Sequence, residues 1–364
     1  MANREEHMTS RYRPAIRNLM RSVANRTLGA LLLPSICATA MTAVAAEPSS
    51  KLAQYDVAGI VAFRTKYFAG TSGFEQRREA FARMMDDVPA PAGVSHFDVD
   101  SDGVRGRWFT PIQDGNTCAK RIVLYIHGGG FYSGSSSTHR ALVAQLAKTA
   151  DANVFAVDYR LLPESTYPSQ IDDVLRAWDW MIEQGYTADR VVVAGESVGG
   201  NLAIELSLRL REQHRSLPAA LLLMSPVTDL AVTGESMMEN GSRDPIIQRT
   251  SMITVSRAYL GDVPPNNPDV SPLYANLRGL PPMLIQVGST ETLMDDAVRF
   301  ARRAGTMDVP VSLEIWPNMI HQWQLFPFMI RDAGNAIQDG ASFIRARTLT
   351  DNRTHTECIS MKAK

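Results

Sequence analysis

Short apolar runs recur along most of this chain, and they constrain its fold more than any other feature. Each run is rich in Val, Ile, Leu and Met, and the stretches between the runs carry apolar residues at helical spacing. Such runs suit strands that are buried on both faces of a parallel sheet. The chain is therefore predicted to be an α/β protein. The runs are 122–126, 154–157, 191–194, 220–224, 283–287 and 311–315.

Two segments stand outside this alternation. Residues 51–85 have helical spacing, and residues 94–99 and 104–109 read as an antiparallel hairpin that turns at residues 101–103. The 58 residues between Met224, where one strand is expected to end, and Met283, where the next is expected to begin, are too many for a simple crossover. We expect segments 51–90 and 229–275 to form a helical cap on a catalytic domain that spans residues 51–350.

The two ends of the chain are predicted to lie outside this domain. Residues 11–26 are rich in arginine, an apolar stretch follows at 28–34, and small residues run to Ala46, as in an export signal with its cleavage site. Residues 1–46 are thus expected to direct the protein to the periplasm or outside the cell. The alternative is a disordered or helical extension on a cytoplasmic protein. Pro34 argues against a membrane anchor. Residues 351–364 form a tail.

Two cysteines remain after the expected cleavage, Cys118 and Cys358. They allow one disulfide but do not demonstrate it, and free thiols are the favoured interpretation. The formal net charge is −1, so the composition carries no electrostatic signature of nucleic-acid binding. We expect a small, weakly charged molecule as the partner, and neither a cofactor nor a metal.

The stretch 195–200, Gly-Glu-Ser-Val-Gly-Gly, joins the run 191–194 to a helical segment that begins directly after it. Strand, sharp turn and helix are the context of a nucleophile elbow, in which a strained backbone exposes the serine. Side chains at Gly195 and Gly199 would collide with the neighbouring strand and helix. The pattern by itself is equally typical of an ordinary strand-to-helix turn, so Ser197 needs partners before it indicates a nucleophile.

Candidate partners follow the last two runs, in the order serine, acid, histidine. His321 lies shortly after the run 311–315, and Glu291 lies shortly after the run 283–287. The carboxyl ends of parallel strands meet at one edge of a sheet, which is where open α/β sheets place their chemistry. His321 is the candidate general base, and Glu291 is the candidate acid that orients it. Asp295 is the alternative acid, although it is expected to enter the next helix.

A glycine-rich turn, His127-Gly-Gly-Gly-Phe131, follows the run 122–126. The amides of Gly129 and Gly130, together with the amide of Val198, are candidates for an oxyanion hole. A phosphate-binding turn is the alternative, but the chain has no G-x-x-x-x-G-K motif.

Four motifs follow one another along the chain: 127–130 (HGGG), 158–164 (DYRLLPE), 195–200 (GESVGG) and the late His321. In this order they resemble the hormone-sensitive-lipase-like family of α/β hydrolases, also called the bacterial family IV esterases. The resemblance covers residues 51–347 and implies an eight-stranded, mostly parallel sheet with flanking helices and a helical cap. It also implies hydrolysis of short or medium acyl esters through an acyl-enzyme on Ser197.

The chain departs from the family pattern at three positions. Glu196 and Val198 stand where much of the family has aspartate and alanine, and Glu291 stands where aspartate is more frequent. Stretches 280–288 and 320–323 are most similar to the branch of ε-lactone hydrolases and related esterases. A lactone substrate is therefore a second expectation.

Further roles follow from the chemistry of the predicted site. Phe131, Tyr132 and Trp323 are expected to shape an apolar substrate pocket, and Arg160 is expected to form buried ion pairs rather than to bind substrate. The alternatives to an esterase are a small-molecule binding protein on the same fold, or an acyltransferase or amidase that uses the same triad. An oligomer is compatible with the sequence.

Overall fold

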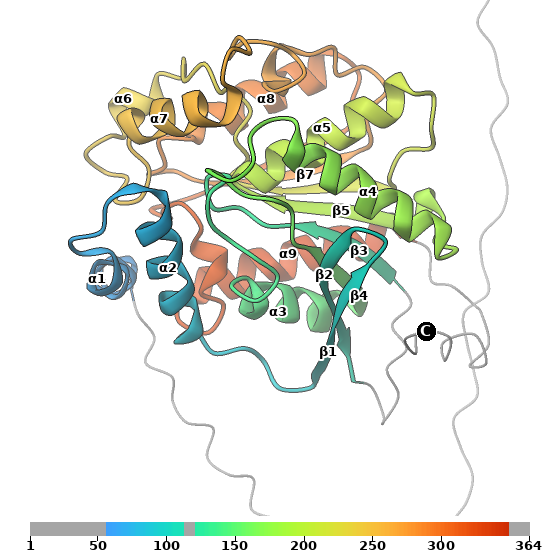
Figure 1. Cartoon of the computed structure of the whole chain (residues 1–364), viewed down its shortest axis with the longest axis horizontal. Coiled ribbons are helices and arrows are strands. Elements are labelled where there is room, and N and C mark those ends of the chain that lie inside the picture. The colour runs from blue at the N-terminus through green and yellow to red at the C-terminus, as the bar shows by residue number, and fades with distance from the viewer. Residues whose placement is uncertain (1–55, 113–120, 349–364) are drawn as a thin grey trace, which may run out of the picture. The chain divides into compact units, whose positions relative to one another are not determined.

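The computed structural model describes residues 56–112 and 121–348 of the chain (Figure 1). The predicted export signal (residues 1–46), the predicted tail (351–364), Cys118 and Cys358 all lie outside the described residues. Within the described residues, no helix is long and apolar enough to cross a membrane.

One eight-stranded sheet forms the centre of the described chain, as predicted (Figure 1). Its strand order is β1-β2-β4-β3-β5-β6-β7-β8. Pairs β1–β2 and β2–β4 are antiparallel, and the other neighbouring pairs are parallel. The strands are β1 (Val94–Ser101), β2 (Val104–Pro111), β3 (Arg121–Ile126), β4 (Ala152–Val157), β5 (Val191–Glu196), β6 (Ala220–Met224), β7 (Met283–Gly288) and β8 (Val311–Trp316).

The predicted hairpin is confirmed, with a tighter turn than expected. Ser101 pairs with Val104, so only Asp102 and Gly103 connect the two strands. Both residues have positive φ, 56° and 74°, which is the backbone conformation of a two-residue turn that matches the twist of the strands.

Helices cover both faces of the sheet (Figure 1). Along β5, Val191 and Val193 pack into the core beneath one helical layer, whereas Val192 and Ala194 pack into the core beneath the other. Both sets are apolar because both faces are buried, which explains the continuous apolar run. One layer contains α4 (Ser169–Glu183), α5 (Val198–Glu212) and α8 (Met294–Thr306), and the other contains α3 (Arg140–Ala150) and α9 (Arg331–Arg347).

The last strand differs from the prediction that all these runs are buried. None of the six residues of β8 is fully buried, and Ile315 is 46% exposed. The reason is its position, because β8 is the edge strand next to β7 and has a neighbour on one side only.

The two segments expected to form a cap contain helices at the left of Figure 1. The N-terminal segment holds α1 (Val57–Phe68) and α2 (Gly73–Asp86), and the insertion between β6 and β7 holds α6 (Ser236–Glu239) and α7 (Arg249–Leu260). Both segments reach the glycine-rich turn after β3. Phe74 of α2 stacks on Tyr132 with ring centroids 4.9 Å apart, and Tyr259 of α7 stacks on Phe131 at 3.7 Å.

Candidate active site

Ser197 forms the turn between β5 and α5. Its backbone angles are φ 55° and ψ −120°, a conformation that L-residues other than glycine seldom adopt. A Cβ atom on Gly195 would lie 2.2 Å from the carbonyl oxygen of Gly199, and one on Gly199 would lie 2.1 Å from that of Ile126. The two glycines are therefore required by space, and the strained turn has the form of a nucleophile elbow.

His321 lies beside the serine. Ser197 Oγ is 2.9 Å from His321 Nε2. The ring therefore accepts a hydrogen bond from the hydroxyl when Nδ1 carries the ring proton. Both side chains are buried, with 4% of Ser197 and 1% of His321 exposed. The pair can therefore transfer a proton in a site from which most water is excluded.

Glu291 completes the row of polar groups. His321 Nδ1 lies 2.8 Å from Glu291 Oε2, and Glu291 Oε1 accepts hydrogen bonds from Ser225 Oγ at 2.7 Å and from the amide of Gly288 at 2.6 Å. These two donors fix the carboxylate, and the carboxylate in turn fixes the tautomer and orientation of the imidazole. Asp295, the alternative acid, lies in the first turn of α8 and accepts from the amide of Ser236 at 3.0 Å.

Hydrogen bonds join the loop that carries the acid to the loop that carries the histidine. The Ser289 amide donates to the Trp316 carbonyl at 2.9 Å, and Thr290 Oγ1 donates to the Met319 carbonyl at 2.6 Å. The insertion holds the same acid loop from the other side, since Asn240 Nδ2 donates to the Glu291 carbonyl at 2.8 Å. The separation of acid and base is thus set by hydrogen bonds from backbone and side-chain donors to the backbone carbonyls of these loops.

Two opposing effects act on the pKa of His321. Burial by itself lowers the pKa, but the Glu291 hydrogen bond and charge, followed by the charges of Glu196 and Asp244, outweigh burial and raise it above 6.5. The site therefore favours the imidazolium form that arises when the histidine takes a proton from Ser197.

The glycine-rich turn presents free backbone donors. Gly129 and Gly130 have φ values of 110° and 63°, which L-residues rarely adopt. Within the described part of the chain, neither amide donates to another backbone or side-chain group. Val198 is the first residue of α5, where amides have no acceptor inside the helix. These three amides have the character that an oxyanion hole requires.

His127, the first residue of this turn, is a neutral structural histidine. Burial first, and then the neighbouring His139, lower its pKa to about 3. Its ring stacks on Tyr159 with centroids 4.1 Å apart, and the Tyr159 hydroxyl donates to the His127 carbonyl at 2.8 Å. These contacts anchor the start of the turn to the segment after β4.

The residues expected to shape the pocket have different surroundings. Phe131 and Trp323 are fully buried, Phe131 against Tyr259 and Trp323 next to Trp316. Tyr132 is partly exposed. Of the three side chains, Tyr132 is the one that is exposed to solvent.

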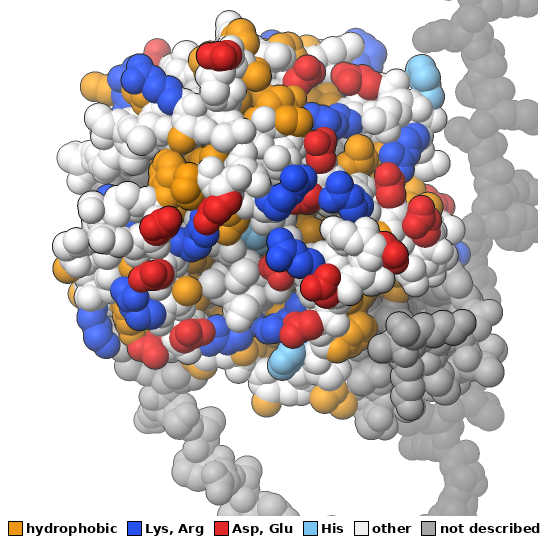
Figure 2. Space-filling view, viewed as in Figure 1, with side chains coloured by type: hydrophobic (Ala, Val, Ile, Leu, Met, Phe, Trp, Pro, Cys, Tyr) orange, Lys and Arg blue, Asp and Glu red, His pale blue; other side chains and the backbone are white. Residues whose placement is uncertain are grey.

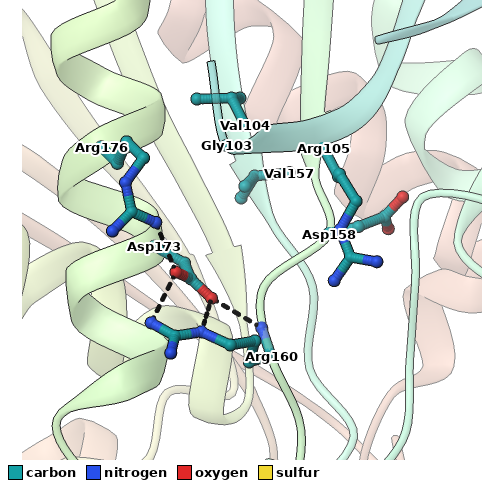
Figure 3. Close-up of a pocket in the computed structure, with 8 residues that line it drawn as sticks. All are labelled: Gly103, Val104, Arg105, Val157, Asp158, Arg160, Asp173 and Arg176. Carbon is teal, nitrogen blue, oxygen red and sulfur yellow. Dashed lines mark hydrogen bonds and ion pairs between the residues drawn. The ribbon is translucent and has the colours of Figure 1, made fainter. Parts of the chain in front are cut away.

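A cleft of about 370 Å³ and an adjoining hollow of about 110 Å³ share Arg105, Asp158 and Arg160. Figure 3 shows the smaller hollow. Arg160 and Arg176 both pair with Asp173, at 2.8 Å each. The ion pairing of Arg160 is as predicted, but its side chain is 43% exposed rather than buried. No residue of the Ser197–His321–Glu291 row lines either space. Positive and negative side chains are interspersed over the face shown in Figure 2.

Two residues beside the row were not predicted from the sequence. Ser225 follows β6 directly, so the rule that selected Glu291 and His321 at the carboxyl ends of strands would also have selected Ser225. His139 Nε2 lies 3.3 Å from Glu196 Oε2, and its position at the start of α3 carries no sequence signal of that contact. Among the described residues, no group of three or more His, Cys, Asp or Glu side chains is arranged to hold a metal ion.

The sheet order, the elbow and the histidine that follows the last strand define the α/β-hydrolase class of proteins. The model of an α/β-hydrolase-fold family matches residues 123–325. The chain is 36% identical over 276 residues to an acetyl-hydrolase of Streptomyces hygroscopicus, covering 75% of this chain and 90% of that protein. It is 40% identical over 226 residues to an esterase of Acinetobacter venetianus, covering 62% and 75% respectively.

Two solved structures indicate the family within this class to which the chain is similar. An esterase from the bacterial hormone-sensitive lipase family superposes with a TM-score of 0.76 at 33% identity, covering 79% of this chain and 96% of that one. A hormone-sensitive lipase from a metagenome library superposes with a TM-score of 0.76 at 34% identity, covering 81% of this chain and 99% of that one. The chain belongs to the hormone-sensitive-lipase-like family of α/β hydrolases, as its motifs predicted.

Proposed function

We propose that this carboxylesterase hydrolyses short to medium acyl esters through an acyl-enzyme on Ser197. The observation that carries the proposal is the continuous row of hydrogen bonds from Ser197 Oγ through His321 to Glu291, with both heavy-atom separations below 3.0 Å. Nucleophile, base and orienting acid in this geometry make up the machinery of acyl transfer.

In the first half of the reaction, His321 Nε2 takes the proton of Ser197 as Oγ attacks the ester carbonyl carbon. The carbonyl oxygen becomes negatively charged, and the amides of Gly129, Gly130 and Val198 are the donors assigned to it. Collapse of this intermediate breaks the bond to the alcohol oxygen, which receives the proton from His321. A water molecule then attacks the acyl-enzyme by the same steps and releases the acid and the free serine.

The acyl chain is expected to be short. The relatives include an acetyl-hydrolase and a Pseudomonas putida ethyl acetate hydrolase, the latter 30% identical to this chain. Val198 at the elbow is bulkier than the alanine common in the family. Tyr132 is assigned to the pocket wall. A lactone is a cyclic ester that the same residues can open, and it forms a second substrate class to be tested.

A panel of p-nitrophenyl esters from acetate to laurate, with several lactones, tests this assignment. The expected result is turnover that is highest for acetate to butyrate and absent in Ser197→Ala. Lactone hydrolysis above that of the esters would move the substrate class to lactones. A folded wild-type protein that turns over none of these compounds would overturn the proposal.

A further inference from the structure

Glu196, the last residue of β5, is a buried carboxylate that the triad does not use. It directly precedes Ser197 in the chain, and its side chain is fully buried. Burial of a charged carboxylate without partners is costly, so the groups around it show what the charge does.

The first group is His139, whose Nε2 lies 3.3 Å from Glu196 Oε2. The His139 ring in turn lies 5.5 Å from the ring of His127 at the start of the glycine turn. The carboxylate also fills the space beside Gly128, where a Cβ atom would lie 2.1 Å from Glu196 Oε2. Glu196 is thus packed directly against the backbone of the predicted oxyanion turn.

The second group is the catalytic histidine itself. Glu196 Oε1 lies 3.8 Å from His321 Nε2. The side chain of Gln322, the residue after His321, also acts on this carboxylate as a hydrogen-bond donor. Glu291 contacts the other ring nitrogen, Nδ1. The imidazole is therefore flanked by two buried carboxylates, one beside each nitrogen.

The charge state of Glu196 agrees with its contacts to His139 and His321. Burial opposes the charge of Glu196, but the His139 hydrogen bond and the charges of His139 and His321 lower its pKa overall, so it is ionised at neutral pH. Tyr125 and Tyr159 also face it. Burial first, and the Glu196 charge second, raise the pKa of both phenols well above their usual range, so both remain neutral.

We propose that Glu196 is a positioning residue of the active site, which stabilises the protonated ring of His321 from the Nε2 side and braces the glycine turn together with His139. This inference rests on the proposed function, because it assigns to His321 the task of accepting the Ser197 proton. The charge at 3.8 Å acts when the ring becomes an imidazolium, which is the step in which Nε2 takes that proton.

The pH dependence of kcat/KM separates this role from a purely structural one. Neutral Glu196→Gln removes the charge at 3.8 Å, so the acidic limb of the profile should move to lower pH by about one unit. Activity on its plateau should fall by about tenfold. Glu196→Asp keeps the charge, and its acidic limb should stay close to that of the wild type. Glu291, Asp244 and His139 also act on this site, and all three are unchanged in these variants.

Three outcomes are distinguishable. A displaced limb in Glu196→Gln with a retained limb in Glu196→Asp supports the proposal. Variants that are slower but have the wild-type limb would overturn it, because a packing role changes the rate and not the titration of His321. If Glu196→Gln does not fold, the smaller uncharged variant Glu196→Ser must show the same displacement. An inactive wild type would instead overturn the esterase assignment.

Discussion

His321 Nδ1 lies 2.8 Å from Glu291 Oε2, although the two residues are 30 positions apart in the chain. They meet because β7 and β8 are parallel neighbours, so the loops after these strands leave the sheet at the same edge. Ser197 follows β5 at that edge. The geometry of a parallel sheet therefore assembles three side chains from three separate segments.

Replacing the acid should distinguish Glu291 from Asp295. Glu291→Gln should lower kcat by roughly 10³- to 10⁴-fold, because the amide can no longer hold the imidazolium or its tautomer. Asp295→Asn keeps an oxygen to accept from the Ser236 amide and should remain within about twofold of wild type. Steady-state hydrolysis of one short p-nitrophenyl ester measures both variants. The opposite ranking would assign the acid to Asp295.

Ser225 is predicted to support catalysis through its hydrogen bond to Glu291. Ser225→Ala removes the 2.7 Å hydrogen bond to Glu291 Oε1 and should lower kcat by about tenfold, as expected for a bond to a charged acceptor. Ser207→Ala is the matched control, since that buried hydroxyl donates only to the Ala203 carbonyl within α5. Equal turnover of the two variants would remove Ser225 from the site.

Stability should depend on pH through Asp296. Burial raises its pKa to about 7, even though the amides of Thr228 and Asp229 donate to the carboxylate. The native state thus holds a proton that the unfolded chain has already lost, so stability declines as the pH rises through 7. Between pH 6 and 8 this contribution to the free energy of unfolding falls by on the order of 1 kcal/mol.

Asp296→Asn isolates that contribution. Urea unfolding at several pH values should show a smaller loss of stability between pH 6 and 8 in the variant than in the wild type. The part common to both proteins includes Glu205, whose pKa burial raises to about 8. Parallel curves for the two proteins would show that Asp296 is ionised at neutral pH.

Two glycine-to-alanine changes should shift the free energy of unfolding in opposite directions. Gly199→Ala forces a Cβ atom to within 2.1 Å of the Ile126 carbonyl oxygen and should destabilise the fold by about 2 kcal/mol. Gly334→Ala lies in α9, where the nearest atom is 3.5 Å away, and should stabilise the fold by about 0.5 kcal/mol. Denaturant unfolding measures both. If Gly199→Ala left the free energy of unfolding unchanged, the elbow and β3 would be free to separate.

Much of the fold was predictable because its signals are local. Continuous apolar runs mark strands that are buried on both faces, and the order of runs and loops along the chain singled out Ser197, Glu291 and His321. The structure brings these three side chains together. The exposure of β8 was not predictable, because it depends on the order of strands in the sheet rather than on the apolar run itself.

The surroundings of the site depend on tertiary packing and left little trace in the sequence. The contact of His139 with Glu196 is set by the path of the segment between the glycine turn and α3, which is largely irregular. The positive φ of Phe131, 61°, and the stacking of its ring on Tyr259 are a second example. No periodicity marks either arrangement.

Covalent labelling is the sharpest test of the role of Ser197 as a nucleophile that His321 activates. Wild-type protein treated with an aryl organophosphate should gain one adduct per chain, located on Ser197 by peptide mass spectrometry, with release of one equivalent of the phenol. Labelling of His321→Ala should be slower by on the order of 10³-fold or more. A folded wild type that leaves Ser197 unmodified would show that Ser197 is not the nucleophile. A His321→Ala variant that is labelled at the wild-type rate would show that His321 does not activate it.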